Sequence, residues 1–191
     1  MRATSKTQAD MRWKINSASY NKASQTLETL MVKSKPTLHL ICGLPGSGKT
    51  TLAKQLEQAN QAVRFSPDEW LHRLEIDFYD EAARARVERL QWEVAQQLLR
   101  HGNEVVLENG FWSKEERDLY RTIADGIGAT TKVHFLDVPM IELKDRIAKR
   151  NLNRDPDTPE VDPSCLDEWA KLFEPPSSDE LGQDTTAVLR Q

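Results

Sequence analysis

The sequence predicts an α/β protein in which helices cover both faces of a parallel sheet. Short apolar runs alternate along the chain with longer segments whose apolar residues recur every three or four positions, which is typical of strands alternating with helices. The first short run leads directly into a glycine-rich loop, and a helical pattern follows that loop. A chain of 191 residues suits one domain of this class.

Short β-prone apolar runs predict the strands. They cover residues 37–42, 62–65, 104–108 and 131–138, and a weaker run at 185–189 predicts one more strand. Because helices separate the strands, neighbouring strands should run parallel, with their carboxyl ends along one edge of the sheet. Ligands of such sheets bind at that edge, so the residues that follow each strand are the candidates for function.

Helices are predicted between the strands. They cover residues 50–60, 68–74, 79–100, 113–124, 140–151 and 164–173, while the polar segments 153–163 and 175–184 are predicted loops. The longest helix is supported by apolar residues three and four positions apart, from Ala83 to Leu98. Pro67 is well placed as the first residue of a helix, and Ser113 with Glu116 forms a capping box at the start of another.

Residues 1–35 differ in composition from the rest of the chain. They contain seven lysines and arginines against two acidic residues, with many polar residues and little apolar periodicity. This composition predicts a basic disordered tail, followed by a single domain over residues 36–191. Translation that begins at Met31 is an alternative, which the intact mass of the natively expressed protein would test.

The composition of the whole chain narrows its partners and its location. The formal net charge is −4, whereas binding along a nucleic-acid backbone uses a basic stripe, so no such binding is expected. No apolar run reaches the roughly 18 residues of a membrane span, so no membrane partner is expected. Cys42 and Cys165 fit neither a metal-ligand nor a CxxC spacing, which favours reduced thiols in a cytoplasmic protein.

The loop after the first strand matches the phosphate-binding pattern GxxxxGK(S/T). Its glycines allow backbone N–H groups to surround phosphate oxygens, and the following helix adds its positive end. Lys49 would reach the outer phosphates, and Thr50 would offer its hydroxyl to magnesium. The loop therefore predicts a site for ATP or another nucleoside triphosphate with Mg²⁺, and no motif selects adenine over guanine. The predicted nucleotide-binding residues are Gly43, Leu44, Pro45, Gly46, Ser47, Gly48, Lys49, Thr50 and Thr51.

Two carboxylates are predicted at the ligand edge of the sheet. Asp68, just beyond the second strand, would orient or deprotonate an acceptor hydroxyl, or it is simply an acid favoured in a first helical turn. Glu108 ends the third strand, and would hold magnesium through water as a Walker B carboxylate does, or it is a polar strand end. The aromatic residues Trp70, Phe111 and Trp112 are equally consistent with an acceptor pocket and with the core.

Arginines are concentrated in the helix after the fourth strand. Arg146 and Arg150 are four positions apart and hence on one helix face. They would close over the triphosphate and stabilise the charge that develops during phosphoryl transfer, with the polar loop 153–163 moving as part of a lid. Nearby acids leave solvent-exposed ion pairs as the alternative. Arg117 and Arg121, also four apart, are candidates for holding an acidic acceptor, although a surface helix would have the same pattern.

Together these motifs resemble the small P-loop kinases, a group that includes polynucleotide 5′-kinases, chloramphenicol phosphotransferase, zeta-type toxin kinases and bacterial proteins labelled AAA-family ATPase or predicted kinase. The resemblance covers residues 37–190. It rests on the phosphate loop, Ser66-Pro67-Asp68, the run VVLENGFWS at 105–113, Arg117, the lid arginines and the run FEPP at 173–176. The hexameric AAA+ machines fit badly, because the chain has no room for their helical second domain.

The resemblance implies a P-loop NTPase fold, a three-layer α/β/α sandwich with a five-stranded parallel sheet of order 2-3-1-4-5 and a helical lid. It also implies roles by position. The catalytic residues would be Lys49, Asp68, Arg146 and Arg150, and the metal ligands would be Thr50 and Glu108. Related proteins usually carry Asp where this chain has Glu108, so that assignment depends on the longer side chain still reaching a metal-bound water.

The predicted function is transfer of the γ-phosphoryl group of ATP to a hydroxyl acceptor, with Mg²⁺ as cofactor. One alternative is a nucleotide-binding switch or slow NTPase that acts through a partner and needs no acid at position 68. Another is a kinase of nucleic-acid 5′-hydroxyl ends, since a short single strand would fit despite the net negative charge. The sequence determines neither the acceptor nor the oligomeric state.

Overall fold

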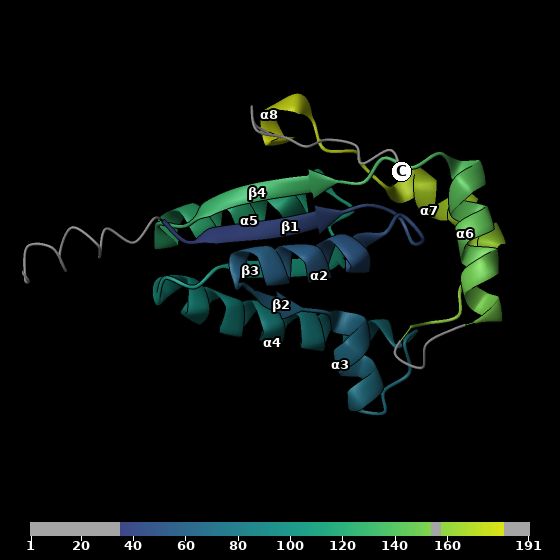
Figure 1. Ribbon diagram of the computed structural model, residues 1–191, viewed down its shortest axis with the longest axis horizontal. Helices are drawn as coiled ribbons and strands as arrows, with labels where there is room; N and C mark the ends of the chain where they lie inside the picture. The colour runs from purple at the N-terminus through teal and green to yellow at the C-terminus, as the bar shows by residue number, and fades with distance from the viewer. Residues whose placement is uncertain (1–34, 154–157, 182–191) are drawn as a thin grey trace, which may run out of the picture. The chain divides into compact units, whose positions relative to one another are not determined.

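The computed structural model describes residues 35–153 and 158–181 (Figure 1). In this part of the chain, four strands form one parallel sheet in the order β2-β3-β1-β4. The strands are β1 (Thr37–Cys42), β2 (Val63–Phe65), β3 (Val105–Gly110) and β4 (Thr130–Phe135). The order agrees with the first four positions of the predicted order 2-3-1-4-5. The predicted fifth strand at 185–189 and all but the last residue of the predicted tail lie outside the described residues.

The helices agree with the sequence pattern except near the C-terminus. They are α2 (Lys49–Asn60), α3 (Pro67–Arg73), α4 (Glu81–Arg100), α5 (Lys114–Ile127), α6 (Met140–Leu152), α7 (Leu166–Leu172) and α8 (Ser178–Leu181), with a 3-10 turn η1 (Pro163–Cys165) before α7. The predicted capping box is confirmed, since the Ser113 hydroxyl accepts a hydrogen bond from the Glu116 amide at 3.1 Å. The loop predicted over 175–184 was wrong in part, because α8 lies inside it.

Helices cover the two faces of the sheet and create two apolar cores. On one face, α2 packs Ala53 against Ile41 and Val106 of the sheet. On the other face, α4 and α5 pack Trp92, Leu99, Tyr120 and Ala124 against a larger cluster that includes Leu38, Leu40, Leu107 and Val133. Alternating residues of β1 therefore face the two cores, which explains why this central strand is an almost continuous apolar run.

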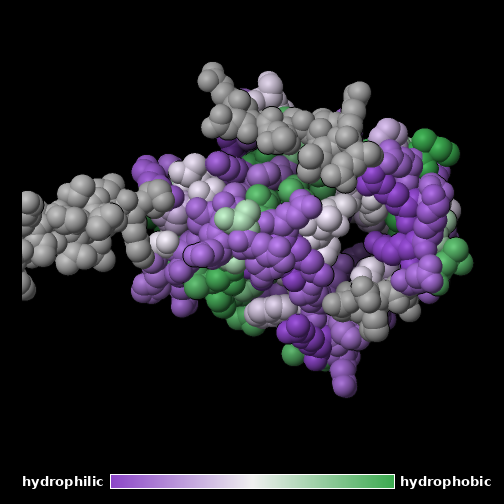
Figure 2. All heavy atoms as spheres, in the orientation of Figure 1, coloured by the Kyte–Doolittle hydropathy of each residue, from purple (hydrophilic) through white to green (hydrophobic). Residues whose placement is uncertain are grey.

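The lid consists of α6, the segment that follows it, and α7. Leu143 and Ile147 of α6 pack with Val161 and with Leu166 of α7 in a small apolar cluster of their own, which also touches Leu44 of the phosphate loop. Figure 2 shows a hollow between the lid and the rest of the molecule, on a face that is mostly hydrophilic. Within the residues that the structure describes, no helix is long and apolar enough to cross a membrane.

The end of β3 departs from regular strand geometry. The register between β1 and β3 shifts by one residue between Leu40, opposite Leu107, and Cys42, opposite Gly110. Such a shift re-aims the side chains that follow it and is common beside active sites. Phe111 then takes a φ of 45°, which is rare for a residue with a bulky side chain. The chain is therefore locally strained where β3 reaches the ligand edge.

Candidate functional site

The phosphate loop connects β1 to α2 and has the backbone that its glycines allow. Gly46 and Gly48 have φ values of 83° and 99°, in the left-handed region that residues with a Cβ rarely adopt. Gly48 is the N-cap of α2, so the first amides of that helix open toward the loop. The ammonium of Lys49 bends back and donates to the carbonyl oxygens of Gly43 and Leu44, both at 3.0 Å. The lysine is thus held inside the loop where phosphates would bind.

The lid helix packs directly against this loop at Gly46. A Cβ on Gly46 would lie 3.0 Å from Cγ1 of Ile147 and 3.2 Å from the Leu143 carbonyl oxygen, closer than carbon atoms comfortably pack. Ser47, beside it, is buried, and its hydroxyl oxygen has no hydrogen-bond partner within the described residues. Gly46 therefore serves both the turn of the loop and the close approach of α6.

Charges from three other elements act on Lys49. Burial lowers the pKa of its ammonium to about 8, while the negative charges of Asp68 and Glu108 oppose that change and the positive charge of Arg150 adds to it. These groups come from α3, β3 and α6. The structure therefore brings three of the predicted site residues into electrostatic reach of the phosphate-loop lysine.

Asp68 lies in the first turn of α3, and an arginine that the sequence analysis missed contacts it. Ser66 caps this helix, and Nη2 of Arg84 in α4 donates to Oδ1 of Asp68 at 2.6 Å. The same nitrogen also donates to the Phe78 carbonyl oxygen at 3.4 Å. The guanidinium restricts the orientation of the carboxylate. No local pattern could have paired these residues, because they are 16 positions apart.

Glu108 is buried and only partly satisfied. Nη1 of Arg64 donates to its Oε1 at 2.8 Å, whereas its Oε2 accepts no hydrogen bond within the described part of the chain. Burial raises the pKa of Glu108, against the opposing effects of Ser66 and of the Arg64 charge. Arg64 also donates to Glu57 at 3.1 Å and to both oxygens of Glu69 at 2.7 and 2.8 Å. One guanidinium thus joins α2, β2, α3 and β3 beneath the site.

Magnesium fits the residues at this edge only together with a nucleotide. No group of three His, Cys, Asp or Glu side chains that could hold a metal occurs in residues 35–153 and 158–181. Mg²⁺ in nucleotide sites keeps several waters and takes one or two protein oxygens beside the phosphates. The exposed Thr50 and the remaining oxygen of Glu108 suit that kind of coordination.

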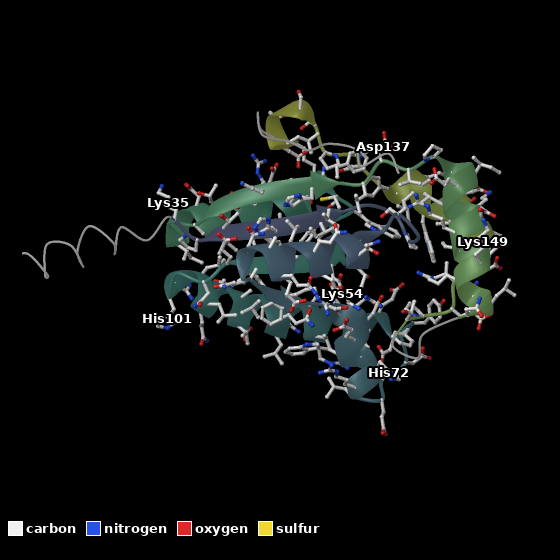
Figure 3. All side chains as sticks on the ribbon, viewed as in Figure 1. Lys35, Lys54, His72, His101, Asp137 and Lys149 are labelled. Carbon is white, nitrogen blue, oxygen red and sulfur yellow. The ribbon has the colours of Figure 1, made fainter. Side chains whose placement is uncertain are left out.

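The two lid arginines differ in position. Burial raises the pKa of Tyr79, and the charge of Arg150, which also acts on Lys49, opposes that rise. Nη2 of Arg150 donates to the Pro159 carbonyl oxygen at 3.2 Å. Arg146 pairs instead with Glu142 of its own helix, at 2.5 Å. Lys149, labelled on α6 in Figure 3, pairs with Asp145 at 2.7 Å at the surface. Only Arg150 of the predicted pair is thus shown within reach of the phosphate loop.

A contact also joins the lid to the opposite side of the site. The Tyr79 hydroxyl, just before α4, donates to the carbonyl oxygen of Glu160 in the segment after α6. Asn151, at the end of α6, supports that segment, since it donates to the Val161 carbonyl oxygen at 2.7 Å and accepts from its amide at 3.4 Å. The lid is therefore tied to the loop that precedes α4.

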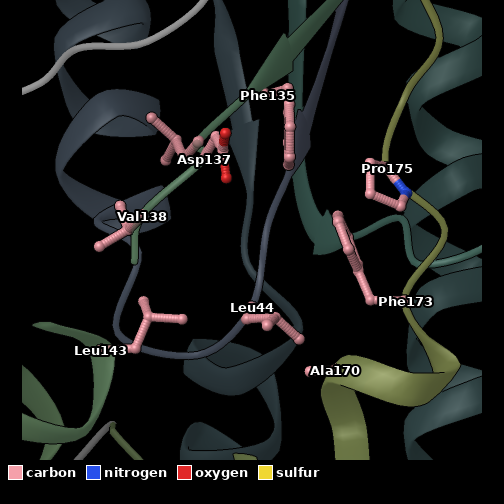
Figure 4. A pocket seen from close by; sticks show the side chains of 9 residues that line it. Leu44, Phe135, Asp137, Val138, Leu143, Ala170, Phe173 and Pro175 are labelled. Carbon is pink, nitrogen blue, oxygen red and sulfur yellow. The ribbon is translucent and has the colours of Figure 1, made fainter. Parts of the chain in front are cut away.

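A pocket of about 150 Å³ lies beside the phosphate loop, on the side of β4 (Figure 4). Its walls come from the loop, the end of β4, α6, α7 and the segment after α7. The side chains among them are apolar except for Asp137, although nearly half of the pocket surface is polar. They are formed by Leu44, Phe135, Leu136, Asp137, Val138, Leu143, Ala170, Phe173 and Pro175. Apolar walls with one carboxylate suit a flat ring that carries a hydrogen-bond donor.

Arg117, which the sequence made a candidate for holding an acidic acceptor, is fully buried and bound to the protein itself. Its Nε and Nη2 donate to the two oxygens of Glu180 at 2.6 and 3.1 Å, and its Nη1 donates to the carbonyls of Phe111 and Glu174 at 3.0 and 2.8 Å. This arginine fastens the segment around α8 to the end of β3. Arg121 pairs with Asp118 at 2.9 Å.

The three aromatic residues considered for an acceptor pocket separate in the structure. Phe111 is 1% exposed and packs edge-on against Tyr120 at a centroid distance of 5.1 Å, so it belongs to the core. Trp70 packs on the core from α3. Trp112 is partly exposed, and the centroid of its ring lies 6.0 Å from that of Trp169 in α7.

Solved structures share this fold. A Chloroflexus aurantiacus protein provisionally assigned as a kinase matches with a TM-score of 0.62 and 19% identity, over 81% of this chain and 88% of that chain. The Mycobacterium tuberculosis APS kinase CysC, solved with AMPPNP and APS, matches with a TM-score of 0.51 and 24% identity, over 63% of this chain and 73% of that one. A chain of the Pnkp1/Rnl/Hen1 complex matches with a TM-score of 0.52 and 22% identity. The match covers 58% of this chain but only 38% of the chain in that complex. At these identities the likeness shows the fold.

A comparison with family models identifies the family of the chain. A comparison with curated proteins gave no match. The model of the family AAA_33, described as an AAA domain, matches residues 38–176, which is well over half of the chain. The chain therefore belongs to the AAA_33 family of AAA domains, and its fold is that of the small P-loop kinases.

Proposed function

We propose that this protein is a kinase that transfers the γ-phosphoryl group of ATP to a hydroxyl acceptor. The observation that carries the proposal is the convergence of Asp68, Glu108 and Arg150 on Lys49 inside the phosphate loop. Phosphoryl transfer needs such a set, because its catalysis consists almost entirely of positioning and of stabilising charge on phosphate oxygens.

The nucleotide side of the site would be built by the phosphate loop. Its amides and the start of α2 would bind the phosphate chain, and Lys49 would exchange the carbonyls of Gly43 and Leu44 for phosphate oxygens. Thr50 and, through water, Glu108 would hold Mg²⁺. When bound, this ion would offset the negative charge of the phosphates. The pocket beside Leu44 is our candidate for the base of the nucleotide.

The acceptor side would be built around Asp68. Its carboxylate, held by Arg84, would accept a hydrogen bond from the acceptor hydroxyl and point that oxygen at the γ-phosphorus. As the new O–P bond forms, the bond from the γ-phosphorus to the leaving oxygen breaks, and ADP departs with the electron pair. The hydroxyl proton passes to Asp68 and then to solvent. Arg150, joined by Arg146 if the lid closes further, would stabilise the charge on the transferred group.

The experiment is a phosphate-transfer assay with ATP, Mg²⁺ and a panel of hydroxyl compounds, including a 5′-hydroxyl oligonucleotide. Lys49→Ala serves as the blank. Lys54→Ala is the matched control, since Lys54 is an exposed lysine of the same helix, labelled in Figure 3. Acceptor-dependent turnover by the wild type and by Lys54→Ala, absent from Lys49→Ala, would support the kinase. Tight ATP binding with no acceptor-stimulated turnover would instead favour a nucleotide-binding switch.

We also propose that the protein works in the cytoplasm. Both cysteines are free thiols, Cys42 in the core and Cys165 partly exposed, which suits a reducing compartment that supplies ATP. Labelling of the native protein with a thiol reagent under denaturing conditions, without reductant, tests this; a disulfide-linked or blocked pair would contradict it.

A further inference from the structure

Three carboxylates from three helices act on one another on the Asp68 side of the proposed site. Asp68 begins α3, Glu88 lies in the first half of α4 and Glu116 lies in the first turn of α5. Burial raises the pKa of Glu88 to about 7; the negative charges of Glu116 and Asp68 add to this rise, and the charge of Arg84 opposes it. This mutual effect places the three groups within electrostatic reach of one another. We call them the acceptor carboxylates.

Only one guanidinium contacts this set among the described residues, and it is shared. Arg84 lies 2.6 Å from Oδ1 of Asp68 and 3.8 Å from Oε1 of Glu88. One positive charge therefore faces two carboxylates, with Glu116 as a third. Arg64, a partly buried arginine of β2, is occupied by the carboxylates of Glu57, Glu69 and Glu108. No positive charge in these contacts is left over for an anionic acceptor.

Unsatisfied polar atoms on this side point to the same conclusion independently of charge. Gln91 follows Glu88 by three positions on α4, hence on the same helix face, and is 1% exposed. Its Nε2 donates to the Ser66 carbonyl oxygen at 3.1 Å, at the start of the turn that carries Asp68, while its Oε1 has no donor in the described structure. The Oδ1 of Asn109, at the end of β3, is likewise buried without a donor. These oxygens can only accept hydrogen bonds.

We propose that the acceptor is an uncharged or cationic compound rich in hydroxyl or amine donors, and that the site rejects compounds with an anionic group next to the reacting hydroxyl. This inference rests on the proposed kinase function and names its substrate class. Hydroxyl and ammonium groups would satisfy the carboxylate and amide oxygens, whose burial is otherwise costly. An anionic acceptor would add a like charge beside Asp68 and Glu88, which share Arg84 as a counter-charge. A 5′-hydroxyl nucleic-acid end, with its neighbouring phosphate, belongs to the rejected class.

Two matched series of compounds test the charge preference. Glycerol, 2-amino-1,3-propanediol and glycerate share a three-carbon skeleton, so that charge is the main variable among them. Glucose, glucosamine and the open-chain acid gluconate form a second series on six carbons. Binding to the protein with AMPPNP and Mg²⁺ is followed through the side-chain amide NMR signals of Gln91 and Asn109. We expect the amino compound of the better-bound series to bind at least ~10-fold more tightly than the acid, a difference of about 1.4 kcal/mol. Equal or tighter binding of the acids, or no shift with any compound, would overturn the inference.

A charge-neutral variant locates the preference in the acceptor carboxylates. Glu88→Gln keeps the shape of the side chain and should reduce the ratio of amine to acid affinity ~3- to 10-fold, with little change in AMPPNP affinity. Glu93→Gln is the control, since Glu93 is an exposed acid of the same helix. Equal ratios for wild type, Glu88→Gln and Glu93→Gln would also overturn the inference.

Transfer assays on the same compounds separate this inference from the proposed function. Charge-ordered binding without any phosphoryl transfer would support the pocket and contradict the kinase. Transfer that favours gluconate, glycerate or the oligonucleotide would support the kinase and contradict the pocket chemistry argued here.

Discussion

Arg117, which is buried, and Arg64, which is partly buried, both pair with carboxylates, but their surroundings differ. Arg117 is 0% exposed, and two of its nitrogens donate to the two oxygens of Glu180, one to each. Ser177 donates further hydrogen bonds to that carboxylate. Arg64 faces three carboxylates, and one oxygen of Glu108 has no donor among residues 35–153 and 158–181. The closed cluster has nothing left to offer a ligand, whereas the open cluster holds surplus negative charge and an acceptor atom beside Lys49. Incomplete pairing therefore separates the functional cluster from the structural one.

The largest effect is expected from breaking the closed cluster. Arg117→Met leaves Glu180 buried without a counter-charge and should lower the free energy of unfolding by ~3–5 kcal/mol. Urea unfolding followed by circular dichroism measures it. The double variant Arg117→Met/Glu180→Leu removes both charges and should recover much of that loss, since replacing a buried pair is far less costly than breaking it. A double variant as unstable as the single one would mean that the backbone contacts of Arg117, not its charge, carry the effect.

A substitution of Asp68 tests the cluster around Lys49, and its effect is expected on activity instead of stability. Asp68→Asn keeps the size of the side chain and removes the charge that orients the acceptor hydroxyl, so the rate of transfer should fall ~10²-fold or more. ATP affinity, measured by calorimetry, should stay within a factor of about three. Asp77→Asn, in the exposed loop before α4, is a matched control. An unchanged transfer rate in Asp68→Asn would remove Asp68 from the mechanism.

One oxygen of Glu108 accepts a hydrogen bond from Arg64, and the other could accept one from a metal-bound water. Glu108→Gln separates these two roles. The amide can still accept from Arg64, but its nitrogen cannot accept from a metal-bound water. We expect the Mg²⁺ concentration for half-maximal turnover to rise ~10-fold, with a small change in unfolding free energy. Titration of turnover with Mg²⁺ at saturating ATP gives the answer. A loss of stability with an unaltered Mg²⁺ dependence would place Glu108 in the structural class.

The smallest effect concerns pH. Burial lowers the pKa of Lys49 from 10.5 to about 8, so between these values the unfolded chain binds more protons and the stability of the nucleotide-free protein rises with pH. Phosphates favour the ammonium, so ATP affinity should weaken as the pH rises above about 8, by up to ~10-fold for each pH unit. Calorimetry across this range in two buffers would also show proton uptake on binding. Lys49→Arg should bind with no such pH dependence, because arginine stays charged.

The parts of the fold that could be predicted are those that depend on local sequence patterns. The first four predicted strands, the capping box at Ser113 and the phosphate loop follow from short-range preferences, and the structure confirms them. The short helix α8 was missed because four residues leave no periodicity to detect. Phe111, a core residue with a φ of 45°, has no signal that sequence alone could give, since its conformation depends on contacts made by the rest of the chain.

The candidate site divides in the same way. The sequence pointed to Lys49, Asp68, Glu108 and Arg150, because each follows a strand or lies in the helix that forms the lid. The groups that position them could not be found by spacing, since Arg84 and Arg64 lie 16 and 44 positions from the carboxylates that they hold. The same limit made Arg117 look like a substrate-binding residue, since its counter-charge lies 63 positions away.

That separation of 63 positions also has a meaning in time. A chain is synthesised from its N-terminus, so α5 and Arg117 leave the ribosome well before Glu180 exists. Until then the guanidinium would be buried without its counter-charge, which is costly enough to keep this corner open. The end of β3, including Phe111, should therefore reach its folded conformation only after residue 180 has been synthesised. A nascent chain would not contain a folded nucleotide site before that moment.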